Sequence, residues 1–393
     1  MPIKGRNAEQ MAGIAVYHNI LWSKYKGVVF SELHSIANEH GIHIEFNQIA
    51  ETENSRMQLG STQAEYHKYP YKLYFNSSYE KINKFILCYT LLISVFRSKA
   101  DVIVLPGYDK IEYWVMLFGV LMKRKVCAVF CDSTINDKEQ KKLKGILKQL
   151  FFSKCAGVFC YGQRSAEYVR HYGVPQSNVY MRCQAAALPS LYQPERALEK
   201  RRSRAPEKGK PKFAYIGRLS TEKGIDDLIV AFANVLKVYP NSELEIYGDG
   251  PEKVQLQYLI NRLEINSNAK LKGVLNSQEF EDLYTRITCL VLPSRSEPWG
   301  LVVNESLSYS CPVIVSSVCG CVPELVKDRI TGLVVKPNLP HELARAMVEA
   351  VDLFSDITLT GRNCLETIAP FSPKNAAKAI FNGCESMYMQ CKR

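Results

Sequence analysis

The sequence lacks both a long hydrophobic run and a recognisable export signal. Its longest apolar runs, at 85–96 and 113–122, are well short of the roughly 18 residues that a membrane-spanning helix requires. The polar residues 1–10 do not have the charged, apolar and small-residue regions of a signal peptide. We therefore expect a cytoplasmic protein without a transmembrane span.

The cysteines are numerous but are not organised for metal binding. There are 13 of them, scattered along the chain. Cys319 and Cys321 are too close together for a zinc knuckle, and the Cys127/Cys131 pair has no second pair to complete a site. We expect reduced, mostly buried thiols that act as small hydrophobic residues, which also favours the cytoplasm.

The composition is that of a globular protein with a basic surface. The 393 residues are 47% hydrophobic and 23% charged, which predicts two or three domains with sizeable cores. The net charge of +11 favours an anionic partner but does not choose between a nucleotide, a nucleic acid and a lipid. Nucleic acid is disfavoured because we find no zinc finger, no basic helix with dimer heptads and no RNA-binding pair of aromatic strands.

The most informative stretch is 294–305, which contains Glu297 and Glu305 with seven residues between them. An apolar run at 289–292 predicts a buried strand before it, and 301–310 predicts a short helix after it. Gly300 would let a ligand approach the N–H groups at the helix start, where an anion is favoured. This arrangement suits a molecule with a negative middle and hydroxylated ends, such as a nucleotide sugar. The alternative is a pair of solvated surface glutamates.

Strands that end in glycine turns recur around this stretch. Examples are 213–217, ending at Gly217, and 244–248, ending at Gly248. Between 212 and 354 the series resembles the carboxy-terminal half of retaining glycosyltransferases of family 4 (glycosyl transferases group 1), which have the GT-B fold. The resemblance implies an α/β protein with two Rossmann-like, doubly wound parallel-sheet domains facing a cleft.

The expected domain order follows from this resemblance and from local composition. We expect an acceptor-binding domain at 1–192, a basic solvated linker at 193–211 and a nucleotide-sugar-binding domain at 212–374. By analogy with the family, 375–393 should form a helix that crosses back to the first domain.

The resemblance assigns roles to residues of the second domain. Arg218 and Lys223, with backbone amides at Gly300 and Leu301, would neutralise the leaving diphosphate without metal, since the sequence contains no Asp-x-Asp pair. The alternative for Arg218 and Lys223 is a surface salt-bridge pair. Glu305 would bind ribose hydroxyls, and Glu297 the donor sugar. The base would be bordered by 248–251 and 272–275, which include Gly248, Gly250 and Val274, and Gly217 would be a further substrate-binding residue.

Candidate residues of the first domain follow its strands. His18 lies near the carboxyl end of the predicted strand at 13–20, and Gly27 lies in the loop after it, at the edge where ligands of open α/β sheets bind. His18 could equally be a hydrogen-bonded histidine at a strand end, and Gly27 stands alone where the family has a glycine pair. Asp132 follows the strand at 126–131 and is the candidate sugar contact or acceptor base, or else a helix cap. Family members often have a histidine before this aspartate, whereas here the residue is Cys131.

Two further segments carry weaker signals. The basic amphipathic pattern at 138–155 predicts a helix that lies on an anionic membrane surface, or an ordinary packed helix with its lysines in water. Residues 50–82 are polar and aromatic, and we expect an irregular surface segment there.

The implied activity is retaining transfer of a hexose, such as mannose, glucose or galactose, from GDP or UDP to a hydroxyl of a glycan or lipid-linked acceptor. A role in bacterial surface polysaccharide synthesis, such as lipopolysaccharide or exopolysaccharide, is our hypothesis. No cofactor or metal is expected. The alternatives are a phosphorylase or epimerase of the same fold, for which we find no signature, and an inactive sugar-nucleotide binder or membrane-associated scaffold.

Overall fold

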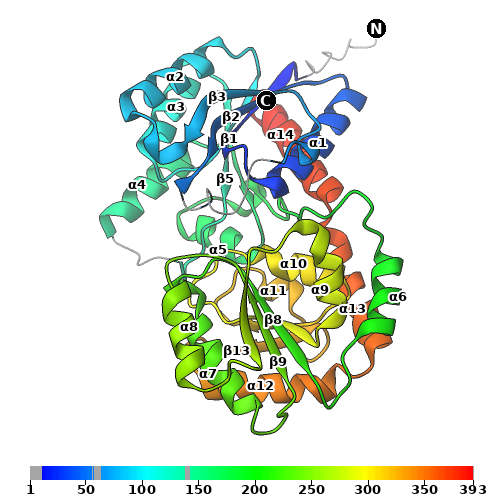
Figure 1. The fold of residues 1–393 in the computed structure, drawn as a ribbon. Helices are drawn as coiled ribbons and strands as arrows, with labels where there is room; N and C mark the ends of the chain where they lie inside the picture. Colours follow the sequence, from blue (N-terminus) through cyan, green and yellow to red (C-terminus); the bar gives the residue numbers. More distant parts are fainter. Residues whose placement is uncertain (1–10, 55, 57–62, 138–141, 393) are drawn as a thin grey trace.

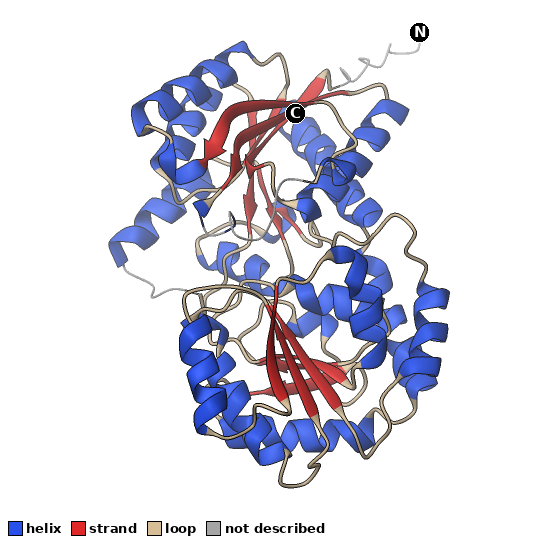
Figure 2. Cartoon of the chain, viewed as in Figure 1, coloured by secondary structure: helices blue, strands red, loops and turns tan. Residues whose placement is uncertain are grey.

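The computed structural model describes residues 11–54, 56, 63–137 and 142–392. The chain forms two lobes, one above the other in Figure 1, each built on its own parallel sheet. Helices cover both faces of each sheet, as Figure 2 shows by colour.

The first domain contains a seven-stranded sheet in the order β3-β2-β1-β4-β5-β6-β7, with all neighbours parallel. Its strands are β1 (Gly13–Ile20), β2 (His43–Thr52), β3 (Tyr71–Ser78), β4 (Val102–Leu105), β5 (Val126–Cys131), β6 (Gly157–Cys160) and β7 (Val179–Tyr180). Its main helices are α1 (Lys24–Glu39), α2 (Lys84–Arg97), α3 (Ile111–Met122), α4 (Lys142–Ser153) and α5 (Gln163–His171).

The second domain contains a six-stranded parallel sheet in the order β10-β9-β8-β11-β12-β13. Its strands are β8 (Lys212–Ile216), β9 (Glu243–Tyr247), β10 (Ala269–Gly273), β11 (Cys289–Leu292), β12 (Val313–Ser316) and β13 (Gly332–Val335). Its helices include α7 (Ile225–Val235), α8 (Lys253–Arg262), α9 (Phe280–Arg286), α10 (Leu301–Ser308), α11 (Val322–Leu325), α12 (Pro340–Leu353) and α13 (Ile357–Ile368).

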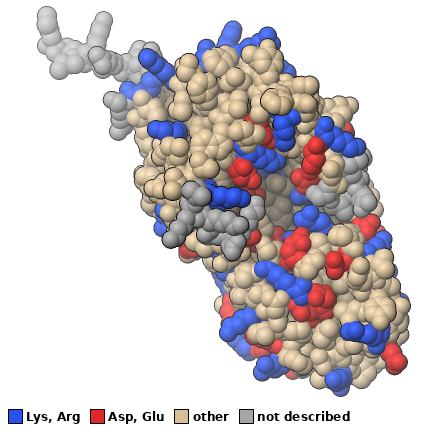
Figure 3. Space-filling model, turned by 90° about the vertical axis from the view of Figure 1, so that its left-hand side faces the viewer, with Lys and Arg blue, Asp and Glu red and all other residues tan. Residues whose placement is uncertain are grey.

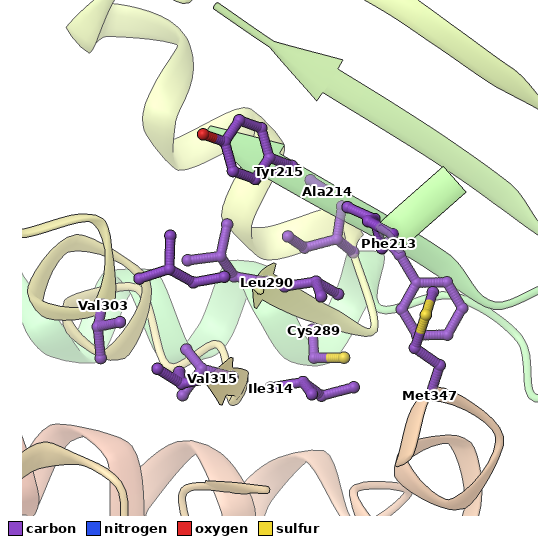
Figure 4. Close-up of a cluster of buried hydrophobic side chains, with 14 of the residues drawn as sticks. Phe213, Ala214, Tyr215, Cys289, Leu290, Val303, Ile314, Val315 and Met347 are labelled. Atoms are coloured by element: carbon purple, nitrogen blue, oxygen red, sulfur yellow. The ribbon is translucent and has the colours of Figure 1, made fainter. Parts of the chain in front are cut away.

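These two sheets confirm the predicted fold class. In each one the first strand of the domain lies inside the sheet, and the chain winds outward from it in both directions. Strands β11 and β12 are buried on both faces, which explains their unbroken apolar sequence. Figure 4 shows the result in the second domain, where Leu290 and Ile314 pack near Val303 of α10 and Met347 of α12.

The segment predicted to be irregular contains strand β3 at the edge of the first sheet. Most of its side chains are exposed or half-buried, so its sequence mixes polar and aromatic residues. A buried parallel strand would instead read as a continuous apolar run. The prediction for 50–82 was therefore wrong, because an edge strand does not carry that signal.

The segment expected to be a solvated linker contains helix α6 (Pro194–Arg204), which packs against α9 and α13. Arg201 is only 1% exposed. Its guanidinium donates to the carbonyl oxygens of Tyr284 (2.7 Å), Ile287 (2.9 Å) and Thr288 (3.0 Å). Arg201 of this basic segment thus has a structural role, because it holds α6 against the second domain.

Helix α14 (Pro373–Lys392) lies against α1 of the first domain, and Figure 1 shows it in red leaving the lower lobe for the upper one. Its Ile380 and Phe381 share a core cluster with Ile14 and Val16 of β1. The chain therefore crosses between the domains twice.

Helix α4 accounts for much of the predicted basic helix, although 138–141 lie outside the described residues. Its Phe151 is buried, whereas Ile146, Leu147 and Leu150 are exposed. None of the helices in the described part of the chain is long and apolar enough to cross a membrane.

Candidate functional site

A cavity of about 490 Å³ lies between the two domains. Its lining includes Lys24 just after β1, Asp132 just after β5, Gly217 just after β8 and Glu297 after β11. These are the carboxyl ends of central strands, where ligands of open α/β sheets bind. Figure 3 shows the surface hollowed between the lobes, with side chains of both charge signs at the margins.

The cavity brings together all four predicted catalytic residues and most of the predicted binding residues. The lining includes Asp132, Gly217, Arg218, Lys223, Gly248, Val274, Glu297, Gly300, Leu301 and Glu305. A second cavity of about 900 Å³ opens near α1, α6 and α13, and it contains none of the predicted residues. Its charged lining is limited to Glu32, Glu65 and Lys68, so the smaller cavity is the better candidate for binding a diphosphate.

The structure places His18 outside the cavity lining. Its Nδ1 is 3.0 Å from the carbonyl oxygen of Ile20, and its ring meets the Phe30 ring edge-on. Burial lowers the pKa of His18 to about 3, so the ring is neutral at physiological pH. This environment is that of a hydrogen-bonded histidine at a strand end, the alternative to a binding residue.

Two of the predicted glycines also lie outside the lining. Gly27 is in α1, where an added Cβ would be 2.7 Å from the carbonyl oxygen of Tyr66, so close helix packing explains it. Gly250 has a φ of +159°, and an added Cβ would be 2.3 Å from the carbonyl oxygen of Leu219. It shapes the turn after β9 rather than the cavity surface.

Glu297 and Lys223 form an ion pair inside the cavity. Lys223 Nζ donates to Glu297 Oε2 at 2.8 Å, and the two side chains are only 13% and 15% exposed. Arg218 is more open, at 44% exposed, and lies 3.5 Å from Glu222. Arg218 and Lys223 both face the cavity. Two cations thus lie at one edge of the cavity, each beside a carboxylate, Lys223 with Glu297 and Arg218 with Glu222.

Arg295 fixes the loop that carries Glu297. Its guanidinium bonds the carboxylates of Asp226 (2.8 Å) and Asp227 (2.7 Å) at the start of α7, and its Nε donates to Asn338 at 2.6 Å. These partners hold the loop against two other elements before any ligand arrives. Sequence inspection did not identify this role, because the partners are distant along the chain.

Gly300 allows the sharp entry into α10. It has a φ of +96°, which disfavours other residues, and an added Cβ would be 2.9 Å from the Leu292 side chain. The first-turn N–H groups of a helix lack partners within that helix and favour a negative ligand. Leu301 and Val302, in this first turn, line the cavity. The start of α10, where an anion site is predicted, therefore faces the cavity.

Glu305 lies one helical turn deeper along α10. It accepts a hydrogen bond from the Tyr284 hydroxyl at 3.1 Å. Burial raises the pKa of Glu305 to about 7, although the Tyr284 hydrogen bond and the positive charge of Lys24 act against this rise. Lys24 comes from the opposite domain, so the two lobes interact electrostatically across the cavity. A carboxylate poised near neutrality can accept hydrogen bonds from ligand hydroxyls once it ionises.

Asp132 is the exposed carboxylate that the first domain offers to the cavity. The residue before it, Cys131, is 1% exposed and packs in the core of that domain. Cys131 therefore points away from the ligand and cannot replace a histidine at this position.

A buried ammonium group, that of Lys26, interacts electrostatically with Asp132. Lys26 is 2% exposed, and its Nζ lies 4.2 Å from the Phe130 ring centroid and 4.9 Å from that of Tyr161. Burial lowers the pKa of Lys26 to about 8, and the nearby Asp132 charge opposes that decrease.

Aromatic residues of the first domain complete the lining, and motif inspection missed them. Trp22 and Arg56 line the cavity together, with the guanidinium 4.9 Å from the indole ring centroid. Tyr25 and Tyr161 lie on the same side. An aromatic residue with an adjacent cation is suited to stacking against a sugar ring or a base. Within the described residues, no group of three or more His, Cys, Asp or Glu side chains is arranged to hold a metal.

Part of the chain is similar in sequence to known glycosyltransferases. Residues 197–353 match the family model described as "Glycosyl transferases group 1". An uncharacterized glycosyltransferase of Methanocaldococcus jannaschii is 32% identical over 38% of this chain and 38% of its own length. Alpha-D-kanosaminyltransferase of Streptomyces kanamyceticus is 30% identical over 36% of this chain and 37% of its own length. The matched part of the chain thus spans less than two fifths of each relative.

The whole chain has a structural counterpart. The crystal structure of Anabaena HepE in complex with UDP and glucose superposes with a TM-score of 0.71 and 16% identity, covering 96% of this chain and all of HepE. At that identity the likeness shows the fold. The protein thus has the GT-B fold, and its second domain contains a glycosyl transferases group 1 region.

Proposed function

We propose that the protein is a retaining glycosyltransferase that moves a hexose from a UDP- or GDP-sugar to a hydroxyl of a glycan or lipid-linked acceptor, in bacterial surface polysaccharide synthesis. The observation that carries this proposal is the meeting of Arg218, Lys223, Glu297 and Glu305 with the start of α10 in one interdomain cavity. The family match to 197–353 and the UDP bound by HepE support it.

The donor would be held along the β11–α10 loop. Glu305 would accept hydrogen bonds from the ribose hydroxyls, and the first turn of α10 would contact the diphosphate. Lys223 and Arg218 line the same cavity as Glu297, so Lys223 would bind the diphosphate while Glu297 binds hydroxyls of the sugar. The existing Lys223–Glu297 pair would preorganise both groups.

In the proposed reaction the acceptor oxygen bonds to the anomeric carbon from the face that the diphosphate leaves. The bond between that carbon and the phosphate oxygen breaks, and the departing oxygen takes the acceptor's proton. Arg218, Lys223 and the α10 amides would stabilise the charge that develops on the diphosphate, which is the basis for proposing a metal-independent reaction. Asp132 would orient the acceptor or a sugar hydroxyl from the opposite lobe.

A donor panel tests the binding half of this proposal. UDP, GDP, ADP and their sugars are compared by thermal shift, and the preferred nucleotide should raise the melting temperature by mass action. Absence of any shift at millimolar ligand would contradict the nucleotide assignment.

A turnover assay tests the catalytic half. Donor hydrolysis or transfer by the Glu297→Ala variant should fall at least tenfold, because a charge-assisted contact contributes about 1.5–3 kcal/mol. The matched control is Glu366→Ala on the exposed surface of α13. Unchanged turnover of the Glu297 variant would reject catalysis at this site and favour a sugar-nucleotide binder. Added EDTA should leave wild-type turnover unchanged.

A further inference from the structure

Helices α2 and α3 expose an unusual number of large apolar side chains. Phe85 is 86% exposed, Tyr89 69%, and Phe118 58%. The exposed set comprises Phe85, Ile86, Tyr89 and Phe96 on α2 and Ile111, Phe118, Leu121 and Met122 on α3. Scattered exposed apolar residues are normal, but concentration of this kind on two neighbouring helices marks an interaction surface.

These side chains belong to two helices that pack on each other, and we call their exposed surface the α2–α3 face. Helix α3 packs closely on α2 at Gly119, where an added Cβ would be 2.9 Å from the Leu92 side chain. Phe85, Tyr89 and Phe96 recur at helical spacing, and so do Ile111, Phe118 and Met122, so each helix shows an apolar stripe. Glu112 is the carboxylate within these helices, and it is 1% exposed and bonded to Tyr79 and Lys84.

Cations border the α2–α3 face. The exposed basic residues at its two ends are Lys81, Lys84, Arg97, Lys99, Lys123 and Arg124. Lys125 Nζ lies 3.4 Å from the carbonyl oxygen of Lys99, which shows that the basic carboxyl ends of both helices are adjacent. Glu80 and Asp109 are exposed near the opposite end, so the positive charge is concentrated where α2 and α3 finish.

Helix α4 extends the same side of the molecule. Its Phe151 ring lies 5.1 Å from the Trp114 ring of α3, and its exposed face carries Ile146, Leu147 and Leu150. Figure 3 views the side on which Figure 1 places α2, α3 and α4. There the upper lobe shows a broad area free of charged side chains with Lys and Arg around it, and the hollow between the lobes opens on this side as well.

We propose that the α2–α3 face, extended by α4, docks on a lipid bilayer that carries anionic headgroups. The apolar side chains would enter the headgroup and acyl boundary, and the cations at its border would contact lipid phosphates. The border of cations favours an anionic membrane as the partner, because cations complement the negative charge of lipid phosphates. A purely apolar protein surface would offer these cations nothing to bind. Docking would bring the mouth of the cavity to the membrane surface. The placement of the cavity mouth at the membrane rests on the proposed function. It would give a lipid-linked acceptor direct access to the donor in the cavity.

The test is flotation with vesicles of phosphatidylcholine alone and of phosphatidylcholine containing about 30 mol % phosphatidylglycerol. Wild-type protein should float with the anionic vesicles, and high salt should reduce but not abolish binding. The Tyr89→Ser/Phe118→Ser variant should partition at least about tenfold more weakly, because two large apolar groups no longer leave water. The matched control is Val254→Ser/Tyr258→Ser on α8, whose residues are 75% and 65% exposed, and it should bind like wild type.

Three results would overturn the proposal. The first is that the wild-type protein does not bind anionic vesicles, and the second is that the α8 control loses as much binding as the Tyr89/Phe118 variant. The third is that the wild-type protein forms a stable dimer, that the Tyr89/Phe118 substitutions disrupt this dimer, and that neither protein binds vesicles. The last result would assign the α2–α3 face to a second copy of the chain. The assay contains no donor, and thermal shift with nucleotide is run on the same variants. Failure of docking is thereby distinguished from failure of the proposed transferase activity.

Discussion

Replacing Glu305 with glutamine should stabilise the protein at alkaline pH while weakening its proposed function. Burial raises the pKa of Glu305 from 4.5 to about 7. In the unfolded chain the carboxyl loses its proton at lower pH than in the folded protein, so wild-type stability falls as pH rises from about 4.5 to 7 and stays reduced above that range. Glutamine keeps the shape and the Tyr284 hydrogen bond without this cost.

The magnitude follows from the difference in pKa. A difference of about 2.5 corresponds to about 3 kcal/mol, and water in the open cavity should reduce this to about 1–2 kcal/mol. Urea unfolding of wild type and Glu305→Gln should therefore give similar free energies at pH 4.5 and diverge by about this amount at pH 8. Glu366→Gln on exposed α13 is the control and should show no such divergence.

The same variant should bind nucleotide poorly at every pH, whereas wild-type affinity should increase as pH rises through 7 and Glu305 ionises. Isothermal titration with the nucleotide that gives the largest thermal shift measures both trends. A free-energy difference that is equal at pH 4.5 and pH 8, or a Glu305→Gln variant less stable than wild type at pH 8, would refute the assigned burial cost.

Other substitutions test separate parts of the structure. Lys223→Met should weaken nucleotide diphosphate binding by about 10–100-fold in calorimetry, because a charge-assisted contact is lost, and unchanged affinity would contradict its role. Asp132→Asn should reduce turnover at least tenfold with donor affinity within about twofold of wild type, and a parallel loss of donor affinity would place Asp132 on the donor instead. Arg201→Met should destabilise the protein by about 2–4 kcal/mol in urea because it leaves buried carbonyl groups unpaired, whereas exposed Arg202→Met should have little effect. An Arg201 effect below about 0.5 kcal/mol would contradict the anchoring role.

The fold class and the β11–α10 part of the site could be predicted because their signals are local. Buried parallel strands read as short apolar runs, and Gly300 and the two glutamates occupy fixed offsets from one such run. Edge strand β3 and helix α6 were missed because each is partly exposed and contains many polar residues. Their structure depends on tertiary neighbours that no short window of sequence contains.

The residues that the first domain contributes to the site were harder to predict, because their positions depend on how α1 and the loops fold. Helix α1 begins at Lys24, with Lys26 buried in its first turn and Lys24 facing the cavity. His18 is then covered by the helix that follows it. Trp22 and Arg56 meet across two loops, and a pairing of that kind leaves no spacing signature.

The position of α14 has a consequence for synthesis on the ribosome. Residues such as Ile380 and Met387, close to the end of the chain, complete a core that begins at Ile14 and Val16. The core of the first domain therefore stays incomplete, with apolar surface exposed, until α14 leaves the ribosome. The second domain can complete its own core before that point. Completion of folding would then run opposite to the order of translation, and a premature stop shortly before α14 would harm the early lobe more than the late one.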